Sequence, residues 1–293
     1  MKGQTTLVSM TPSQRKPSSR KPSSRKPGAS SRTRKKASAN GPKNARTLRQ
    51  APGSPLIRCV IFDLDDTLYD CFGQRVKPAH HHAAKAMVKA GLNATIDAAY
   101  RARMKAFRED PMLRHIDAVV TARYGGGDPA VISEAARNAY FNCPVGKLTL
   151  FSGTMPLLRF LHALDIRCFV VSFGEPEIQK AKVHSLGLDR TPAIDRIFYA
   201  DRQNLLTKEA AFRQVKQEFG FKPAEILIVG DRAMSEIRAG NELGMHTVRL
   251  RRGEFASQEP HGRIEQADYT VKNISDVRKL PYEWGTKRDA TKA

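Results

Sequence analysis

Two acidic residues follow the first strongly apolar stretch of the chain. The run CVIF at 59–62 ends at Asp63, and Asp65 comes two positions later. A short apolar run with β-branched members, cut off by polar residues, is typical of a buried parallel strand. Because ligands of open parallel sheets bind beyond the carboxyl ends of the strands, we expect both carboxylates at a binding site. The alternative is that the acidic cluster only caps the turn or helix that follows.

The spacing of these carboxylates suits phosphoryl chemistry. A carboxylate can attack phosphorus as a covalent nucleophile, and Asp63 is predicted to take this role. A second carboxyl close by can protonate the leaving oxygen and later deprotonate water, so Asp65 is predicted to be the general acid and base. Two anions approach each other only around a hard cation, and carboxylate oxygens suit Mg²⁺. Magnesium is therefore the expected cofactor.

Two further residues could hold a phosphoryl group. Ser172 follows a strand predicted at 167–171, and its hydroxyl, with the open N–H groups of the next helix entrance, makes a potential phosphate cradle. Lys208 begins a helix predicted at 208–219, where a cation is disfavoured unless it faces a bound anion. Lys182 is the rival cation, but its place in the middle of a helix favours a solvated face.

A third predicted strand, 226–230, also ends in an acidic residue. Asp231 follows it directly and is well placed to complete a Mg²⁺ site. Glu236 comes five residues later, near the start of a helix. Its carboxylate could orient the water shell of the metal or simply favour the helix N-terminus, and both interpretations stay open.

The stretch VIFDLDDTLYD at 60–70 resembles the first signature motif of the haloacid dehalogenase-like hydrolase superfamily, in its phosphatase form. Ser172 is similar to the second motif, TKEAAF at 207–212 to the third, and ILIVGD at 226–231 to the fourth. The family more often has Asp than Glu at the position of Glu236, which leaves the role of that residue open.

The resemblance implies roles for five residues. In such a phosphatase Asp63 forms an aspartyl phosphate, and Asp65 exchanges protons with the leaving alcohol and with water. The Mg²⁺ ligands are Asp63, the backbone carbonyl of Asp65, and Asp231. Ser172 and Lys208 bind the oxygens of the transferring phosphoryl group.

The order of apolar strands and helical patterns predicts the fold class. We expect an α/β fold, a Rossmann-like parallel sheet flanked by helices, with an inserted all-helical cap domain. Residues 56–72 and 149–285 should form the catalytic core, and residues 73–148 the helical cap, because this segment is too long for a simple crossover. His80, His81 and His82 lie in its first helix, and three consecutive residues point around a helix, so metal binding there is not expected.

The positive charge of the chain is concentrated near its start. The formal net charge is +21, residues 1–50 hold 14 of the 50 lysines and arginines, and no acidic residue precedes Asp63. This Ser- and Pro-rich segment cannot bury a core, so residues 1–55 are expected to be a disordered basic tail and linker. A solvated extension is the favoured interpretation. Weak nucleic-acid contact through residues 1–50 is an alternative, and a transit peptide is opposed by the closely spaced prolines.

Other features concern the compartment. The four cysteines have no pair spacing, which favours reduced thiols over disulfides or a zinc site. No apolar run is long enough to span a membrane. We therefore expect a soluble, cytoplasmic protein without membrane contact.

The leading hypothesis is a Mg²⁺-dependent phosphatase that hydrolyses a small phosphorylated metabolite. A phosphomutase uses the same motifs and differs mainly in the cap. A haloacid dehalogenase is disfavoured, because those enzymes lack the second aspartate and the metal, whereas Asp65 is present. A nucleic-acid-associated protein acting through its basic tail is the alternative from another class. Arg75, Lys77 and Tyr124 are candidate cap or entrance contacts, with ordinary solvated surface positions as the alternative.

Overall fold

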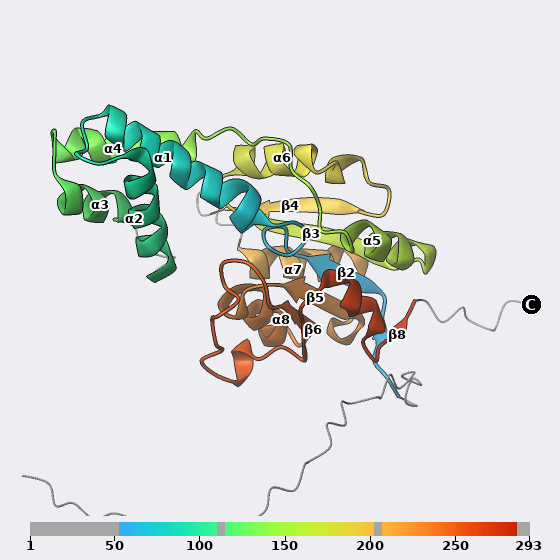
Figure 1. The fold of residues 1–293 in the computed structure, drawn as a ribbon. Coiled ribbons are helices and arrows are strands. Elements are labelled where there is room, and N and C mark those ends of the chain that lie inside the picture. The colour runs from blue at the N-terminus through green and yellow to red at the C-terminus, as the bar shows by residue number, and fades with distance from the viewer. Residues whose placement is uncertain (1–52, 110–114, 202–206, 286–293) are drawn as a thin grey trace, which may run out of the picture. The chain divides into compact units, whose positions relative to one another are not determined.

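The computed structural model describes residues 53–109, 115–201 and 207–285, and the predicted basic tail up to residue 52 lies outside them. Six parallel strands form the main sheet, in the order β4-β3-β2-β5-β6-β7 (Figure 1). The strands are β2 Cys59–Phe62, β3 Arg167–Phe173, β4 Arg196–Ala200, β5 Ile226–Gly230, β6 His246–Leu250 and β7 Tyr269–Val271. The predicted fold class, a parallel sheet flanked by helices, is confirmed.

The two faces of the sheet follow from the alternation of side chains along each strand. Val60 and Phe62 pack in one apolar cluster with the helices α5 (Thr154–Ala163) and α6 (Pro176–Ser185). Cys59 and Ile61 point the other way, into a cluster with α7 (Lys208–Phe219) and α8 (Arg238–Glu242). All four residues of β2 are buried, because helices cover both faces of the sheet.

Four helices lie between β2 and α5 in the chain, and we call residues 73–148 the helical insertion. They are α1 Lys77–Lys89, α2 Ile96–Glu109, α3 Ile116–Tyr124 and α4 Pro129–Phe141, and they share an apolar cluster of their own. A single π-helical turn, η1 (Phe72–Val76), leads into α1. Asp128 caps α4 as predicted, and its side chain accepts the N–H groups of Ala130 and Val131.

The three consecutive histidines point in different directions, as expected. His80 is buried against the rings of Phe107 and Tyr140, whereas His81 and His82 are exposed.

Short elements complete the described chain. Strand β1 (Leu56–Ile57) pairs in parallel with β8 (Glu283–Trp284), which brings the two ends of the described chain together. A second π-helical turn, η4 (Ala233–Ile237), precedes α8. The 3₁₀ turns are η2 Leu188–Arg190, η3 Pro223–Glu225, η5 Arg263–Glu265 and η6 Ile274–Lys279.

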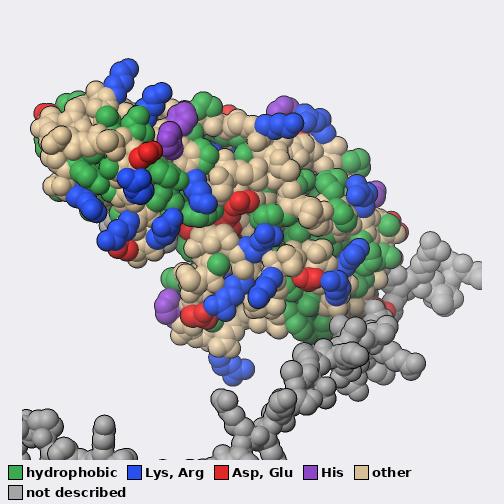
Figure 2. Space-filling view, viewed as in Figure 1, with side chains coloured by type: hydrophobic (Ala, Val, Ile, Leu, Met, Phe, Trp, Pro, Cys, Tyr) green, Lys and Arg blue, Asp and Glu red, His purple; other side chains and the backbone are tan. Residues whose placement is uncertain are grey.

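The described residues carry reduced cysteines and a mixed surface charge (Figure 2). All four cysteines are buried and free. Among the helices that the structure describes, none has the length and apolar character needed to cross a bilayer. On the face shown in Figure 2, lysine and arginine side chains are spread among acidic and apolar ones instead of forming one basic patch. The predicted nucleic-acid contact falls on residues 1–50, outside the described part.

Candidate active site

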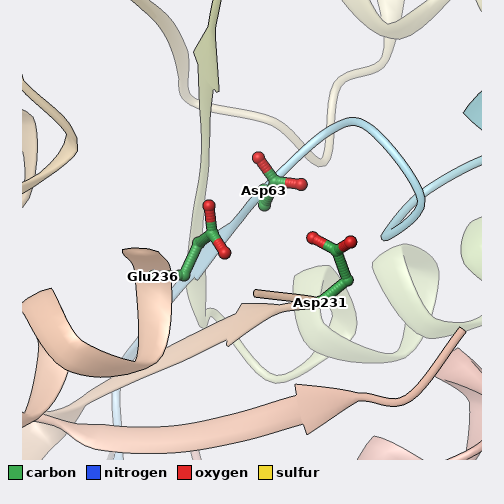
Figure 3. A group of neighbouring side chains, drawn as sticks. All are labelled: Asp63, Asp231 and Glu236. Atoms are coloured by element: carbon green, nitrogen blue, oxygen red, sulfur yellow. The ribbon is translucent and has the colours of Figure 1, made fainter. Parts of the chain in front are cut away.

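Two neighbouring strands deliver carboxylates to the same edge of the sheet. Phe62 in β2 is in register with Val229 in β5, and the Asp63 N–H donates to the Val229 carbonyl at 2.9 Å. Asp231 therefore lies beside Asp63, one step beyond the end of β5. Glu236 reaches back from the π-helical turn η4, and one oxygen of each of the three carboxylates lies within 4.8 Å of the others (Figure 3).

These three carboxylates are buried and repel one another. Burial raises the pKa of Asp63 to about 7, with further rises from Glu236 and Asp65 and an opposing effect of Lys208. Burial likewise raises the pKa of Asp231 well above its usual range, with added repulsion from Glu236 and Asp63. The Asp231 Oδ1 atom is buried without a hydrogen-bond partner in the described structure. This donor set fits a hard divalent cation such as Mg²⁺, which takes oxygen ligands and neutralises their charge.

Lys208 supplies a positive charge inside the cluster. It is the first residue of α7, where Thr207 caps the helix by accepting the Ala210 N–H at 3.1 Å. Its ammonium group forms ion pairs with both Asp63 and Glu236, and the side chain is 9% exposed. Burial lowers the pKa of Lys208, but the two carboxylates outweigh that effect and raise it above its usual value. The lysine is therefore a permanent cation next to Asp63.

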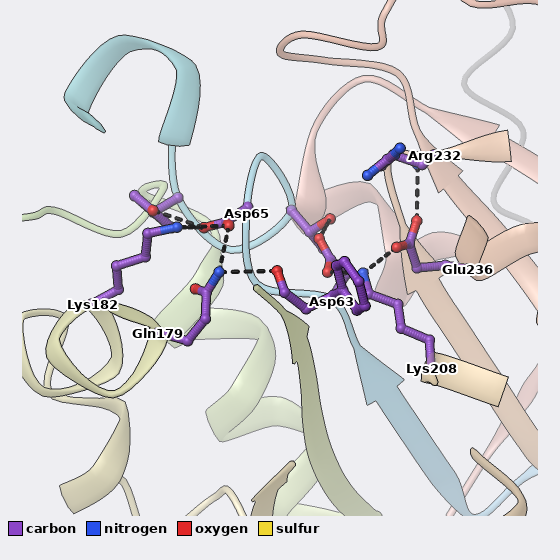
Figure 4. Close-up of polar contacts among 10 residues, drawn as sticks. Asp63, Asp65, Gln179, Lys182, Lys208, Arg232 and Glu236 are labelled. Carbon is purple, nitrogen blue, oxygen red and sulfur yellow. Dashed lines mark hydrogen bonds and ion pairs between the residues drawn. The ribbon is translucent and has the colours of Figure 1, made fainter. Parts of the chain in front are cut away.

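Asp65 faces a different cation. Its carboxylate accepts hydrogen bonds from Lys182 Nζ at 2.8 and 3.0 Å, from the Tyr69 hydroxyl at 2.8 Å and from Gln179 Nε2 at 3.4 Å (Figure 4). Burial alone would raise the pKa of Asp65, but the ion pair with Lys182 and these hydrogen bonds hold it below its usual range. Without substrate the carboxylate is therefore ionised near neutral pH, and it must gain a proton before it can act as an acid.

The expectation that Lys182 lies on a solvated face is wrong. The side chain is only 6% exposed, because α6 turns it toward the loop after β2, where Asp65 neutralises its charge. Gln179, one turn earlier on the same face, was not predicted as part of the site. Thr67 was not singled out either, and its hydroxyl donates to Asp63 Oδ2 at 3.1 Å. Its place four residues after Asp63, in the same turn, is the one sequence signal that could have identified it.

Ser172 lies close to the site but not on the cavity wall. Val170 in β3 pairs with Phe62, so Ser172 sits two residues further, at the same edge of the sheet. It is 1% exposed, and its Oγ atom has no hydrogen-bond partner among the described residues. The strand runs two residues beyond its predicted end, which places Ser172 inside β3 rather than after it.

One cavity of about 320 Å³ joins these groups. Asp63, Asp65, Lys208 and Asp231 are on its wall, so four of the five predicted site residues meet there. The helical insertion adds wall residues from both of its ends, namely Arg75, Val76, Tyr140 and Phe141. Of the three candidate contacts in the insertion, only Arg75 lines the cavity.

Comparisons with known proteins agree on one family. The family model for haloacid dehalogenase-like hydrolases matches residues 57–244. A glyceraldehyde 3-phosphate phosphatase of Methanocaldococcus jannaschii is 30% identical over 76% of this chain and 96% of its own length. The Methanopyrus kandleri protein of the same name is 28% identical over 74% of this chain and 93% of its own length.

Solved structures share the fold. A Bacillus subtilis protein described as a HAD hydrolase, bound to magnesium, superposes with a TM-score of 0.54 at 20% identity, covering 76% of this chain and 98% of its own. A Thermotoga maritima protein described as a β-phosphoglucomutase has a TM-score of 0.55 at 16% identity, covering 76% and 99%. By the match of its family model and by its relatives, the chain belongs to the haloacid dehalogenase-like hydrolase family, and it is a hydrolase.

Proposed function

We propose that this protein is a Mg²⁺-dependent phosphatase that hydrolyses a small phosphomonoester through an aspartyl phosphate on Asp63. The observation that carries the proposal is the position of the Asp63 carboxylate, at the end of a central strand and in contact with the buried Lys208 ammonium. A fixed cation there favours the charge of a phosphoryl group over that of a neutral substrate. The archaeal relatives named glyceraldehyde 3-phosphate phosphatase support the same reaction class.

The proposed reaction has two displacements at phosphorus. In the first, Asp63 forms a bond to phosphorus, the ester P–O bond breaks, and the leaving alkoxide takes a proton from Asp65. In the second, Asp65 removes a proton from water, which attacks phosphorus and releases inorganic phosphate and free Asp63. Lys208 neutralises charge on the phosphoryl oxygens throughout, and the unpaired Ser172 hydroxyl could donate to one of them.

The acidic cluster would hold the cofactor. Asp63, Asp231 and the backbone carbonyl of Asp65 are the proposed Mg²⁺ ligands, with Glu236 either as a further ligand or as a partner of the metal's water. When bound, Mg²⁺ would cancel the repulsion of the carboxylates and polarise the phosphoryl group. Thr67 and Lys208 hold the two oxygens of Asp63 from different sides, which fixes the orientation of the nucleophile.

We further propose that the helical insertion acts as a cap domain over the core. Its residues Arg75 and Tyr140 line the same cavity as Asp63, which supports a role in enclosing the substrate. A cavity of about 320 Å³ is at the small end of ligand sites, which run from roughly 300 to 1,000 Å³. Small phosphorylated metabolites are therefore the substrates to test, and glyceraldehyde 3-phosphate is the first.

The test is release of inorganic phosphate from a panel of phosphorylated metabolites, with Mg²⁺ or with a chelator. We expect hydrolysis that needs Mg²⁺ and falls by at least about 10³-fold in Asp63→Asn, because the nucleophile is lost. Asp97→Asn, an exposed acid on α2, is the matched control and should leave the rate unchanged. Undiminished phosphate release from Asp63→Asn would reject the proposed nucleophile. Formation of an isomerised sugar phosphate instead of free phosphate would indicate a mutase.

A further inference from the structure

One buried carboxylate beside the site has no role in the proposed chemistry. Asp66 follows the proposed acid Asp65 in the loop after β2 and is 4% exposed. Its φ is 57°, in the left-handed region, where a Cβ atom comes too close to the following carbonyl oxygen. A buried acid in this conformation needs contacts that offset both its desolvation and its backbone strain.

Each oxygen of Asp66 accepts a hydrogen bond from the backbone of a different segment. Oδ1 accepts the N–H of Phe72, the first residue of η1, at 3.0 Å. Oδ2 accepts the N–H of Glu254, in the loop after β6, at 3.3 Å, and this partner lies 188 positions further along the chain. One side chain therefore joins the loop after β2, the entrance of the helical insertion and the loop after β6.

The loop after β6 is shaped around the Asp66 side chain. Gly253 has a φ of 66°, and a Cβ atom there would lie 2.2 Å from Asp66 Cγ, so the close approach needs a glycine. Arg249, buried in β6, holds the same loop from another point. Its Nη2 atom donates to the Phe255 carbonyl at 2.8 Å, and its Nε atom donates to the Asp231 carbonyl at 3.0 Å. The loop therefore keeps one anchor when the Asp66 carboxylate is removed.

Both segments that Asp66 joins contribute to the wall of the cavity. The turn η1 contributes Arg75 and Val76, and the loop after β6 contributes Glu254 and Phe255. Phe72 fixes η1 to the rest of the insertion, because its ring stacks on Phe107 of α2 with 6.1 Å between the centroids. The bond from the Phe72 N–H to Asp66 therefore sets where the insertion begins relative to the core.

We propose that Asp66 is a positioning residue that fixes these two parts of the cavity wall relative to the loop after β2. It takes no part in proton or phosphoryl transfer, since the proposed nucleophile keeps its contacts to Thr67 and Lys208 without it. Its two bonds set the shape of the substrate site and hence how tightly the substrate is held. The inference rests on the proposed phosphatase function, because it concerns the binding of the same substrate.

The first test measures amide hydrogen exchange in the full chain without substrate. Asp66→Gly and Asp66→Ala both remove the carboxylate, so exchange should become at least about tenfold faster around Phe72 and around Glu254. Asp70→Asn is the matched control. Asp70 Oδ1 accepts the Gly73 N–H at 2.7 Å in the same turn, and no described hydrogen bond joins it to the loop after β6. The control should speed exchange in η1 alone. Unchanged exchange in either segment of both Asp66 variants would overturn the inference.

The second test separates positioning from stability. Glycine relieves the strain of the positive φ, so Asp66→Gly should melt roughly 2 to 4 °C above Asp66→Ala. Both variants should nevertheless raise KM for glyceraldehyde 3-phosphate by at least about tenfold and change kcat by less than about threefold, because the reacting groups stay in place. Asp66→Asn keeps one acceptor oxygen and should raise KM by an intermediate factor.

A purely structural role would have a different kinetic result. Fewer folded molecules would lower kcat in step with the melting temperature and leave KM at the wild-type value, and that result in both variants would overturn the inference. If no phosphomonoester is hydrolysed at all, the proposed function fails, but the exchange test still decides whether Asp66 fixes the wall.

Discussion

Lys182 is the main charged neighbour of Asp65, and the acid–base behaviour of that carboxyl depends on it. The ammonium group lies 2.8 Å from one oxygen and 3.0 Å from the other, and it lowers the pKa of Asp65. In the proposed first step Asp65 must carry a proton. The basic limb of the kcat/KM profile should therefore report the pKa of Asp65.

Replacing this lysine should move the basic limb in a known direction. Lys182→Met removes the cation, so the pKa of Asp65 rises and the limb moves to higher pH, by about 1 to 3 units for a close opposite charge. The measurement is kcat/KM for phosphate release against pH. Lys180→Met, an exposed lysine of the same helix that pairs with Glu177, should leave the profile in place. An unmoved limb in Lys182→Met would remove Asp65 from the acid role.

Glu236 is expected to support the proposed metal site. Its carboxylate is fully buried, pairs with Lys208 and lies within 4.8 Å of the Asp63 and Asp231 carboxylates. Glu236→Gln keeps the size of the side chain but removes its charge. We expect the Mg²⁺ concentration for half-maximal activity to rise about 10- to 100-fold, the usual effect of losing a ligand's supporting group.

The control for Glu236 is Glu242→Gln in the adjoining helix, where the carboxylate pairs with Arg238 at the surface. That change should not alter the Mg²⁺ requirement. If Glu236→Gln loses thermal stability but keeps the wild-type Mg²⁺ dependence, then Glu236 serves only to hold Lys208.

Predictability from sequence differs among these residues for a physical reason. Asp63 and Asp231 could be predicted because a strand end is a local pattern that fixes where the next side chain lies. Lys182 could not, since its burial depends on which face of α6 packs toward the loop after β2, a contact between residues more than 100 positions apart. Arg75 was only one candidate among three, because nothing local distinguishes a buried arginine from a solvated one.

The N-terminus of α7 positions Lys208, the proposed phosphate-binding cation. Thr207 caps the helix, and Lys208 is its first residue. Thr207→Ala should cost about 1 kcal/mol of unfolding free energy, the usual effect of losing such a cap. It should also lower kcat, because a frayed first turn no longer holds the Lys208 ammonium against Asp63.

A matched cap lies in the helical insertion. Thr95 Oγ1 accepts the Ala98 N–H at 3.2 Å near the start of α2. Thr95→Ala should cost a similar free energy in urea unfolding but leave kcat unchanged. Equal loss of kcat in both variants would mean that stability, and not the position of Lys208, explains the Thr207 effect.

Element types were easier to predict than their local geometry. The helix at 208–219 with its threonine cap and its glycine end appears as predicted. The helix expected around Glu236 instead begins with the π-helical turn η4, which turns Glu236 back onto Gly230. A Cβ atom at Gly230 would lie 2.6 Å from Glu236 Cγ, so the close approach needs a glycine there. Apolar periodicity does not distinguish a π turn from an α turn, and this part of the site could not be foreseen.

The order of strands and helices along the chain was enough to predict the sheet. Adjacent parallel strands must be joined by crossover connections, and the rules for such connections allow few sheet topologies. It was also enough to predict a helical segment between β2 and α5. How that segment contributes to the cavity was not predictable. Tyr140 of α4 lines the cavity, and its ring packs against His80 of α1, which in turn packs against Phe107 of α2. These contacts between helices are not visible in the sequence.

The repulsion among the buried carboxylates makes the stability of the folded protein depend on pH and on Mg²⁺. Burial raises the pKa of Asp63 to about 7 and that of Asp231 well above its usual range. Without metal, the stability that their protonated forms contribute is therefore lost as pH rises, for Asp63 through about 7. Bound Mg²⁺ should offset this loss and compete with the protons. The gain in melting temperature on adding Mg²⁺ should therefore increase between pH 5 and pH 8. At a Mg²⁺ concentration 100 times the dissociation constant, the stabilisation is about 2.7 kcal/mol, or a rise in melting temperature of roughly 5 to 10 °C.

The Asp231→Asn variant separates the repulsion from the metal binding. In chelator it should melt no lower than wild type, because a repelling carboxylate is gone, but its melting temperature should rise little on adding Mg²⁺. A wild-type melting temperature that ignores Mg²⁺ at every pH would contradict a metal site in the acidic cluster.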